Sequence, residues 1–327
     1  MQNNNTATAF WITGKQRGEL RTTELPPHTN EEVRIRTLYS AISLGTEALI
    51  FNNAVPSTEY ERMRAPFQEG QFPTPIKYGY INVGRVEDGP DSLRGRVVFC
   101  LYPHQTHYIV SSDAVTLLPT DIPAERAVLA ANLETAINAL WDASVSIGDR
   151  ITIVGAGVVG CLVGWLAASI PGCDVELIDI NSERAAVCQA LGLQFSLPES
   201  AQNDRDLLIH TSATQDGLTT ALQLAGFEAT ILELSWYGDK MTTIPLGGAF
   251  HSKRLLLRSS QVGQIAPNQR SRWDYKRRLT LALSLLNDDA LDNLISGESA
   301  FADMPQTFQY LINEGRHSLC HRIKYGV

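Results

Sequence analysis

The first 120 residues alternate apolar and polar positions, which is typical of half-buried β-strands. In residues 31–43, EEVRIRTLYSAIS, Val33 and Ile35 alternate with Arg34 and Arg36. Further runs of this kind follow between residues 81 and 119, separated by glycine or Pro-Asp turns. Because stretches with helical spacing are few here, we predict an antiparallel, β-rich domain.

The spacing of apolar positions becomes that of helices from residue 123. Residues 123–143, PAERAVLAANLETAINALWDA, predict an amphipathic helix, and strand-like and helix-like segments then alternate as far as ATILELSW. This alternation predicts a parallel sheet covered by helices. Residues 304–325 predict a helix and a last strand that returns to the β-rich part. The expected fold class is α/β, with one domain at 1–120 and 290–327 and a doubly wound parallel-sheet domain at 121–289.

Residues 151–170, ITIVGAGVVGCLVGWLAASI, are apolar enough to raise a second interpretation, a membrane span. Glycines crowd the first third of this run, however, and a second strand and an amphipathic helix follow it at once. A buried strand, a glycine turn and a buried helix account for both features, so we reject the membrane span.

The glycine turn has the spacing GxGxxG, directly after a predicted strand and at the start of a predicted helix. The first glycine permits a tight turn, the second lets a pyrophosphate approach the backbone, and the third lets the helix pack on the strand. Amides at the helix N-terminus then face the phosphates. The expected cofactor contacts in this turn are Gly155, Gly157, Gly160, Val158 and Val159.

Asp179 follows the next strand and is the acid expected on the adenosine ribose of a dinucleotide. Its charge favours NAD, because it would repel the 2′-phosphate of NADP. Arg184 lies a few residues on and would soften that repulsion. We therefore predict NAD as the cofactor, with NADP as the weaker alternative.

Composition and charge narrow the class of function. The chain has 327 residues, a net charge of −8 and a sequence pI near 5.4, which argues against a general nucleic-acid binder. The basic cluster RSRWDYKRR, residues 270–278, is predicted to be the solvated face of a helix rather than an anion site. The 5 cysteines lack CxxC spacing and fit neither a disulfide framework nor a structural zinc site. Reduced thiols and the lack of a secretory signal in the first 20 residues predict a cytoplasmic protein.

The order of these parts resembles the medium-chain dehydrogenase/reductase family. The segments that carry the resemblance are SAISLGTEAL, PIKYGYINVGRV, LETAINAL and GAGVVG, and AISLGTE is similar to the SGIS-x-GTE pattern of bacteriochlorophyllide-type dehydrogenases. The resemblance covers nearly the whole chain and implies a GroES-like domain joined to a Rossmann domain. It also places Thr135 at the nicotinamide, with Trp236 and Tyr237 either walling the ring or simply packing.

The chain departs from the zinc-dependent members of that family at each metal ligand. Ser43 and Leu44 stand where a cysteine is expected, Tyr80 and Ile81 replace a histidine and a glutamate, and the third ligand position falls near Ala131. Catalytic zinc needs three protein ligands and a water, and leucine and alanine cannot bind a metal. We therefore predict a zinc-free branch.

Without a metal, another group must hydrogen-bond the substrate oxygen as hydride moves. Tyr80 stands at a former ligand position and, in an extended strand, would share a face with Tyr78 but not with Lys77. A phenol with a pKa of about 10 can donate a proton. Two interpretations stay open, namely that Tyr80 is this donor or that it fills the volume of the lost metal.

Other polar residues are candidates for the same site. Thr46 matches the hydroxyl that relays a proton in alcohol dehydrogenases, and Glu47 matches the neighbouring acid, which can instead cap or salt-bridge a local helix. His104 and His107 suit proton transfer near neutral pH, although we expect both at the surface.

We therefore predict an NAD(H)-dependent, zinc-independent oxidoreductase that interconverts a secondary alcohol and a ketone on a mid-sized organic substrate. The alternatives are an NADPH-dependent enone or quinone reductase and a non-catalytic nucleotide-binding protein. The expected partner is a small-molecule substrate, with neither nucleic acid nor a membrane, and a homodimer is left open.

Overall fold

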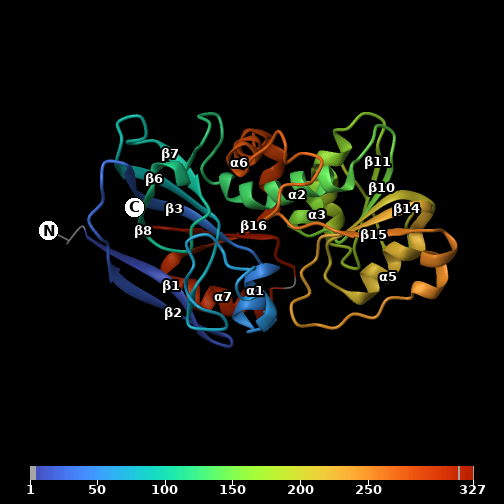
Figure 1. The fold of residues 1–327 in the computed structure, drawn as a ribbon, viewed down its shortest axis with the longest axis horizontal. Helices are drawn as coiled ribbons and strands as arrows, with labels where there is room; N and C mark the ends of the chain where they lie inside the picture. The colour runs from blue at the N-terminus through green and yellow to red at the C-terminus, as the bar shows by residue number, and fades with distance from the viewer. Residues whose placement is uncertain (1–4, 316, 327) are drawn as a thin grey trace. The chain divides into compact units, whose positions relative to one another are not determined.

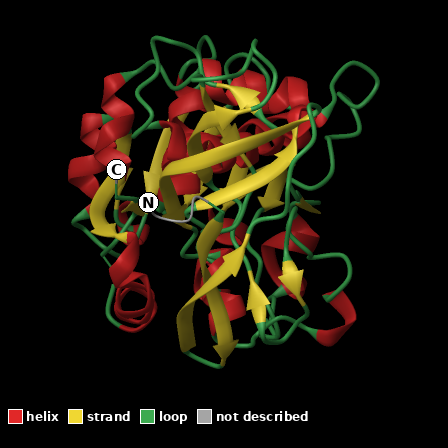
Figure 2. Ribbon diagram, turned by 90° about the vertical axis from the view of Figure 1, so that its left-hand side faces the viewer, coloured by secondary structure: helices red, strands yellow, loops and turns green. Residues whose placement is uncertain are grey.

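The computed structural model describes residues 5–315 and 317–326, which form two compact units. The first unit comprises Met1–Ala131 and Leu279–Val327, and the second comprises Asn132–Arg278. Figure 1 labels the helices and strands, and Figure 2 distinguishes helices in red from strands in yellow.

Two sheets build the first unit. One has the strand order β2-β1-β5-β4, and the other has the order β16-β17-β3-β6-β7-β9, with β8 paired on β3. Their bounds are β1 (Thr6–Gly14), β2 (Arg17–Glu24), β3 (Glu32–Ile42), β4 (Glu69–Gly70), β5 (Ile76–Lys77), β6 (Asn82–Asp88), β7 (Val97–Cys100), β8 (His107–Ser111), β9 (Thr116–Leu117), β16 (Ile295–Ala300) and β17 (Cys320–Lys324). The helices α1 (Thr46–Phe51) and α7 (Met304–Asn313) accompany these sheets.

The alternation in β3 buries one side of the strand, as predicted. Val33 and Ile35 are fully buried and pack with Val86, Val98 and other apolar residues of neighbouring strands. The polar residues between them stay partly exposed. Burial of this apolar face is what favours the strand over other local conformations.

The C-terminal part of the chain completes the first unit. Strand β17 pairs antiparallel with β3, and β16 pairs in parallel with β17. Helix α7 lies beside β2 (Figure 1), and its Phe308 contacts the rings of Phe10 and Phe51 at centroid distances of 5.1 and 4.9 Å. The buried guanidinium of Arg126 donates to Asp289 and Asp292, which fastens this returning segment.

The second unit is a parallel sheet with the strand order β12-β11-β10-β13-β14-β15. Its elements are α2 (Ala130–Ala143), β10 (Arg150–Val154), α3 (Val158–Ala168), β11 (Asp174–Ile178), α4 (Arg184–Ala190), β12 (Gln194–Ser196), β13 (Arg205–His210), α5 (Gln215–Leu224), β14 (Ala225–Glu233), β15 (Leu256–Ser259) and α6 (Tyr275–Ser284). The chain passes between the units within α2 and again within α6. This doubly wound α/β arrangement agrees with the predicted fold class.

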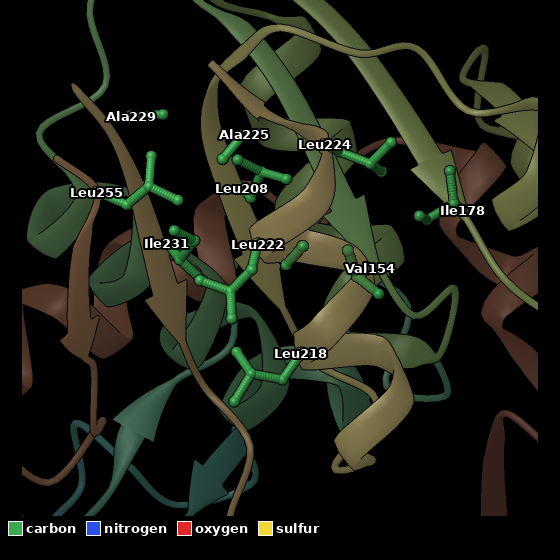
Figure 3. Close-up of a cluster of buried hydrophobic side chains, with 11 residues drawn as sticks. Val154, Ile178, Leu208, Leu218, Leu222, Leu224, Ala225, Ala229, Ile231 and Leu255 are labelled. Carbon is green, nitrogen blue, oxygen red and sulfur yellow. The ribbon is translucent and has the colours of Figure 1, made fainter. Parts of the chain in front are cut away.

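One core of the second unit lies between the sheet and α5, as Figure 3 shows. Val154, Leu208 and Ile231 come from three adjacent strands and meet Leu218 and Leu222 of the helix. Short apolar runs of this kind within the strands are expected where helices cover a parallel sheet. In residues 151–170 the apolar run therefore divides into β10, the glycine turn and α3, and no helix in the described part of the chain is long and apolar enough to cross a membrane.

The segment PIKYGYINVG, which we expected to be extended throughout, is divided into two strands. Strand β5 belongs to the four-stranded sheet and β6 to the larger one, so the chain changes sheet between Lys77 and Asn82. The change occurs at Gly79, whose φ is +133°, a conformation that side-chain-bearing residues rarely adopt. A Cβ at Gly79 would also lie 2.9 Å from the ring of His104.

The basic cluster 270–278 agrees only in part with the prediction of a helix face, because α6 begins at Tyr275 and the first residues of the cluster precede it. Arg270, Arg272, Lys276 and Arg277 are exposed, in agreement with a solvated face. Arg278 is buried instead, where it donates to Glu134 and Asn138 of α2. Its positive charge is therefore paired with Glu134 inside the second unit and does not belong to the exposed basic face.

Candidate functional site

The glycine turn of the second unit is shaped by close contacts of its own backbone. Gly155 has a φ of +110°, and a Cβ on Gly160 would lie 1.9 Å from the Gly155 carbonyl oxygen. Nothing lies within 4 Å of the position that a Cβ on Gly157 would take. The turn therefore leaves open space at its second glycine, at the N-terminus of α3 where Val158 and Val159 begin the helix. Open backbone of this kind suits a pyrophosphate.

Asp179 follows β11 and holds the same turn. Its Oδ2 atom accepts a hydrogen bond from the Ala156 amide at 2.8 Å, and Oδ1 accepts one from the Asn181 amide at 2.9 Å. A carboxylate has further lone pairs, so ribose hydroxyls can still donate to it. Arg184 begins α4 shortly after this acid and is partly exposed.

In the first unit, three hydroxyl groups meet around Tyr80. The Tyr80 hydroxyl donates to Ser43 Oγ at 2.6 Å and also hydrogen-bonds Thr46, the first residue of α1. Burial raises the pKa of Tyr80 to about 12, against the lowering effect of these two hydrogen bonds. All three residues keep some exposure to solvent. The phenol is therefore protonated at neutral pH and can act as a donor.

Behind these hydroxyls lies a fully buried ionisable pair. Glu47 and His104 are 1% and 0% exposed, and their Oε2 and Nε2 atoms are 3.0 Å apart. Glu47 Oε1 also accepts the Ser43 amide hydrogen at 2.9 Å, which fixes the residue that faces Tyr80. The expectation that His104 lies at the surface was wrong, because its other ring nitrogen meets Ser40 Oγ at 2.8 Å inside the unit.

The positions of the missing zinc ligands do not fit a metal. Tyr80 is engaged with Ser43 and Thr46, and Leu44 and Ala131 offer no donor atom. Across residues 5–315 and 317–326, no group of three or more His, Cys, Asp or Glu side chains is placed to hold a metal ion.

The remaining candidates are distributed over both units. Thr135 is partly exposed on α2. Tyr237 follows β14 and donates its hydroxyl to Glu233 at 3.1 Å, beside a partly exposed Trp236. His107 is half-buried on β8, where burial lowers its pKa although Glu87 opposes the shift.

Sequence reasoning missed several polar residues that the fold brings together. Ser43 was considered only as a lost ligand, but it links Tyr80 to Glu47. His210 ends β13 and pairs with Glu233 at the end of β14, across 2.7 Å. The sequence signal that could have identified His210 and Glu233 is a polar residue at the end of an apolar strand, in DLLIHTS and in ATILELSW, respectively.

The sequence is similar to curated sugar and polyol dehydrogenases, whereas no family model matches the chain. D-guloside 3-dehydrogenase of Escherichia coli (strain K12) is 23% identical over 314 residues, which cover 86% of this chain and 89% of that protein. Galactitol 1-phosphate 5-dehydrogenase of the same strain is 24% identical over 213 residues, or 61% and 60% of the two chains.

Solved structures of dehydrogenases share the fold. L-idonate 5-dehydrogenase from Escherichia coli K-12 matches with a TM-score of 0.78 and 14% identity, covering 98% of each chain. An alcohol dehydrogenase from Escherichia coli CFT073, in complex with NADH, matches with a TM-score of 0.77 and 13% identity over 98% of this chain and 100% of that one. Another structure of this fold holds NADP.

The fold is thus that of the medium-chain alcohol dehydrogenases, with a GroES-like and a Rossmann domain. Relatives and structural neighbours alike are named dehydrogenases, and the protein is an enzyme of the dehydrogenase type.

Proposed function

We propose that the protein is an NAD(H)-dependent, zinc-independent oxidoreductase that interconverts a secondary alcohol and a ketone. The observation that supports it best is the group of hydroxyls formed by Tyr80, Ser43 and Thr46, in which Tyr80 and Ser43 stand at positions of lost metal ligands. The names of the relatives, which include a sugar and a polyol dehydrogenase, favour a secondary hydroxyl on a mid-sized polar substrate.

The second unit supplies residues that fit a dinucleotide. The glycine turn leaves space at Gly157, and Asp179 both holds the turn and offers a carboxylate to ribose hydroxyls. The bound nicotinamide supplies or accepts the hydride. The amides of Val158 and Val159, the first of α3, would face the phosphates of the bound dinucleotide.

In the first unit, Tyr80 is the proposed donor to the substrate oxygen. Reduction of a ketone develops negative charge on that oxygen, and the Tyr80 hydroxyl hydrogen, once it turns from Ser43 Oγ to the substrate oxygen, stabilises this charge. Because the pKa of Tyr80 is raised to about 12, the phenol keeps its proton across the working pH range. Thr46 and Ser43 orient the hydroxyl, and the buried Glu47 acts as a positioning residue that holds Ser43.

Turnover of a panel of secondary alcohols tests this proposal. We expect reduction of NAD⁺ on at least one polyol or sugar, with a rate that a strong metal chelator leaves unchanged. Loss of activity together with release of zinc would contradict the zinc-free mechanism. If the protein instead reduced enones with NADPH, the enone reductase alternative would replace the alcohol–ketone reaction proposed here. Saturable binding of the cofactor without turnover of any substrate would favour a non-catalytic nucleotide-binding protein.

The choice of cofactor gives a second prediction, on Asp179. Wild-type protein should bind NADH more tightly than NADPH, since the carboxylate repels the 2′-phosphate. In Asp179→Ser, the ratio of the dissociation constants for NADPH and NADH should fall by about tenfold, which corresponds to about 1.4 kcal/mol of binding free energy. Fluorescence titration with both cofactors measures it.

Asp179→Asn is the matched control for the charge. It keeps an oxygen that can accept the Ala156 amide hydrogen but brings an NH2 group to the Asn181 amide, so one hydrogen bond is lost while the repulsion of the 2′-phosphate is removed. NADPH binding should improve in this variant, and its thermal melting curve measures the cost of the lost hydrogen bond to the Asn181 amide. Equal affinities of the wild type for NADH and NADPH would refute the assigned role.

A further inference from the structure

The hydroxyl group of Tyr78 has no role in the proposed catalytic group. The residue precedes Gly79 at the change of sheet and is only 4% exposed. Within residues 5–315 and 317–326, no hydrogen bond involves its hydroxyl. The oxygen is also not one of the fully buried polar atoms without a partner in this range, so it keeps contact with solvent. Tyr78 thus presents a phenol that can both donate and accept a hydrogen bond.

Aromatic neighbours fix the ring of Tyr78 next to that of Tyr80. The two rings meet edge-on, with centroids 6.2 Å apart and planes at 84°. Tyr78 also packs on Phe72 at a centroid distance of 6.0 Å, and Phe72 in turn stacks on Tyr60 at 5.4 Å. The four rings form a row that ends at the proposed proton donor. Tyr78 therefore cannot turn away from Tyr80 without disturbing the packing of its neighbours.

The backbone between the two tyrosines has little freedom to move as well. Gly79 has a φ of +133°, and a Cβ there would lie 2.9 Å from the ring of His104. That ring is held in turn by Glu47, across 3.0 Å. Burial raises the pKa of Tyr78, and the nearby Tyr80 and Glu47 raise it further, so the phenol is protonated at neutral pH. Two protonated phenols are thus held side by side in the first unit.

Packing alone does not account for the hydroxyl of Tyr78. Holding a mostly buried hydroxyl without a protein partner costs folding free energy. Phenylalanine would pack against Phe72 and Tyr80 in the same way without that cost. A polar group of this kind is explained by a ligand that it binds, and the adjacent Tyr80 is where the proposed function places the reacting oxygen.

We propose that Tyr78 is a specificity-determining residue, which hydrogen-bonds a second hydroxyl of the substrate while Tyr80 binds the oxygen that reacts. The substrate is then a polyol or a sugar, in which another hydroxyl lies within a few carbon atoms of the reacting one. This inference rests on the proposed function, because it requires an alcohol or ketone oxygen at Tyr80.

The expected kinetic effect is on KM. The second hydroxyl takes no part in hydride transfer, so Tyr78 binds it equally well in the ground state and in the transition state. Loss of such an interaction raises KM and leaves kcat unchanged. An alcohol without the second hydroxyl leaves the phenol of Tyr78 without a partner and is therefore a poorer substrate.

The test compares alcohols that differ in one hydroxyl, within a panel of secondary alcohols that includes sorbitol. 2,3-Butanediol and 2-butanol share a carbon chain, and only the diol has a second hydroxyl. We expect the full-length wild type to have a kcat/KM at least about tenfold higher for the diol. In Tyr78→Phe this ratio should fall by about tenfold, through a higher KM for the diol and for sorbitol.

Two controls distinguish a role in specificity from a role in the fold. Tyr60→Phe removes a hydroxyl from the other end of the same row of rings and should leave the ratio unchanged. Tyr78→Phe should melt no earlier than the wild type, because the substitution removes no hydrogen bond between described residues. The kcat for 2-butanol should also be the same in Tyr78→Phe as in the wild type.

The possible results separate this inference from the proposed function. If the wild type oxidises no alcohol of the panel, both are overturned. If it oxidises 2-butanol as efficiently as the polyols, or if Tyr78→Phe leaves the KM for the polyols unchanged, only the role of Tyr78 is overturned. An equal loss of turnover on every alcohol, or a variant that melts earlier or does not fold, would assign the hydroxyl to catalysis or to the fold and would likewise overturn the role in specificity.

Discussion

Replacing Tyr80 by Phe is expected to reduce turnover by about 10²–10³, because it removes one donor to the developing charge on the substrate oxygen. Phenylalanine keeps the ring that meets Tyr78 edge-on at a centroid distance of 6.2 Å. The fold and the affinity for NADH should therefore be retained. Turnover on one accepted alcohol, measured together with the thermal melting curve, checks this.

Thr46→Val is the matched control, since valine has the shape of threonine without its hydroxyl. If Tyr80 is the donor, Thr46→Val should lose less activity than Tyr80→Phe, as it only loosens the orientation of the phenol. The reverse order would move the donor role to Thr46. A loss below about tenfold in Tyr80→Phe, equivalent to about 1.4 kcal/mol of barrier, would leave Tyr80 as a residue that fills space.

The elements with strong periodicity were predictable because local pattern and burial agree. Strand β3 alternates between partly exposed and buried residues from Glu32 to Thr37, and the glycine turn between β10 and α3 follows from the spacing of three glycines. PIKYGYINVG was harder, since its residues suit a strand and only the φ of +133° at Gly79 divides it. Such a conformation depends on packing against His104, which is 25 residues further on in the sequence.

The candidate site was predictable in part, for a similar reason. Tyr80, Thr46 and Glu47 lie at positions that a family resemblance picks out. The pairing of Glu47 with His104 is not visible in the sequence, because the two residues are 57 positions apart and meet only after the sheets form. His210 and Glu233 likewise become neighbours only through the register of β13 and β14.

The second large effect is expected on NADH affinity, at the glycine turn. The variant Gly157→Ala tests it without disturbing the fold. Gly157 has φ and ψ of −78° and −177°, which alanine adopts without strain, and nothing lies within 4 Å of its Cβ position. The variant should therefore melt like the wild type. Its affinity for NADH should fall by at least about tenfold, or 1.4 kcal/mol, because the methyl group occupies the space that a pyrophosphate needs.

Gly160→Ala should lose binding and stability together. Its Cβ would lie 1.9 Å from the Gly155 carbonyl oxygen and 2.9 Å from Thr211 Oγ1, so α3 must move away from β10. Overpacking of this kind costs about 1–3 kcal/mol of folding free energy. Fluorescence titration with NADH and thermal melting of both variants distinguish a direct loss of cofactor binding from a loss of binding caused by destabilisation of the fold. Wild-type affinity in Gly157→Ala would mean that no phosphate approaches this turn, since the methyl group disturbs nothing else.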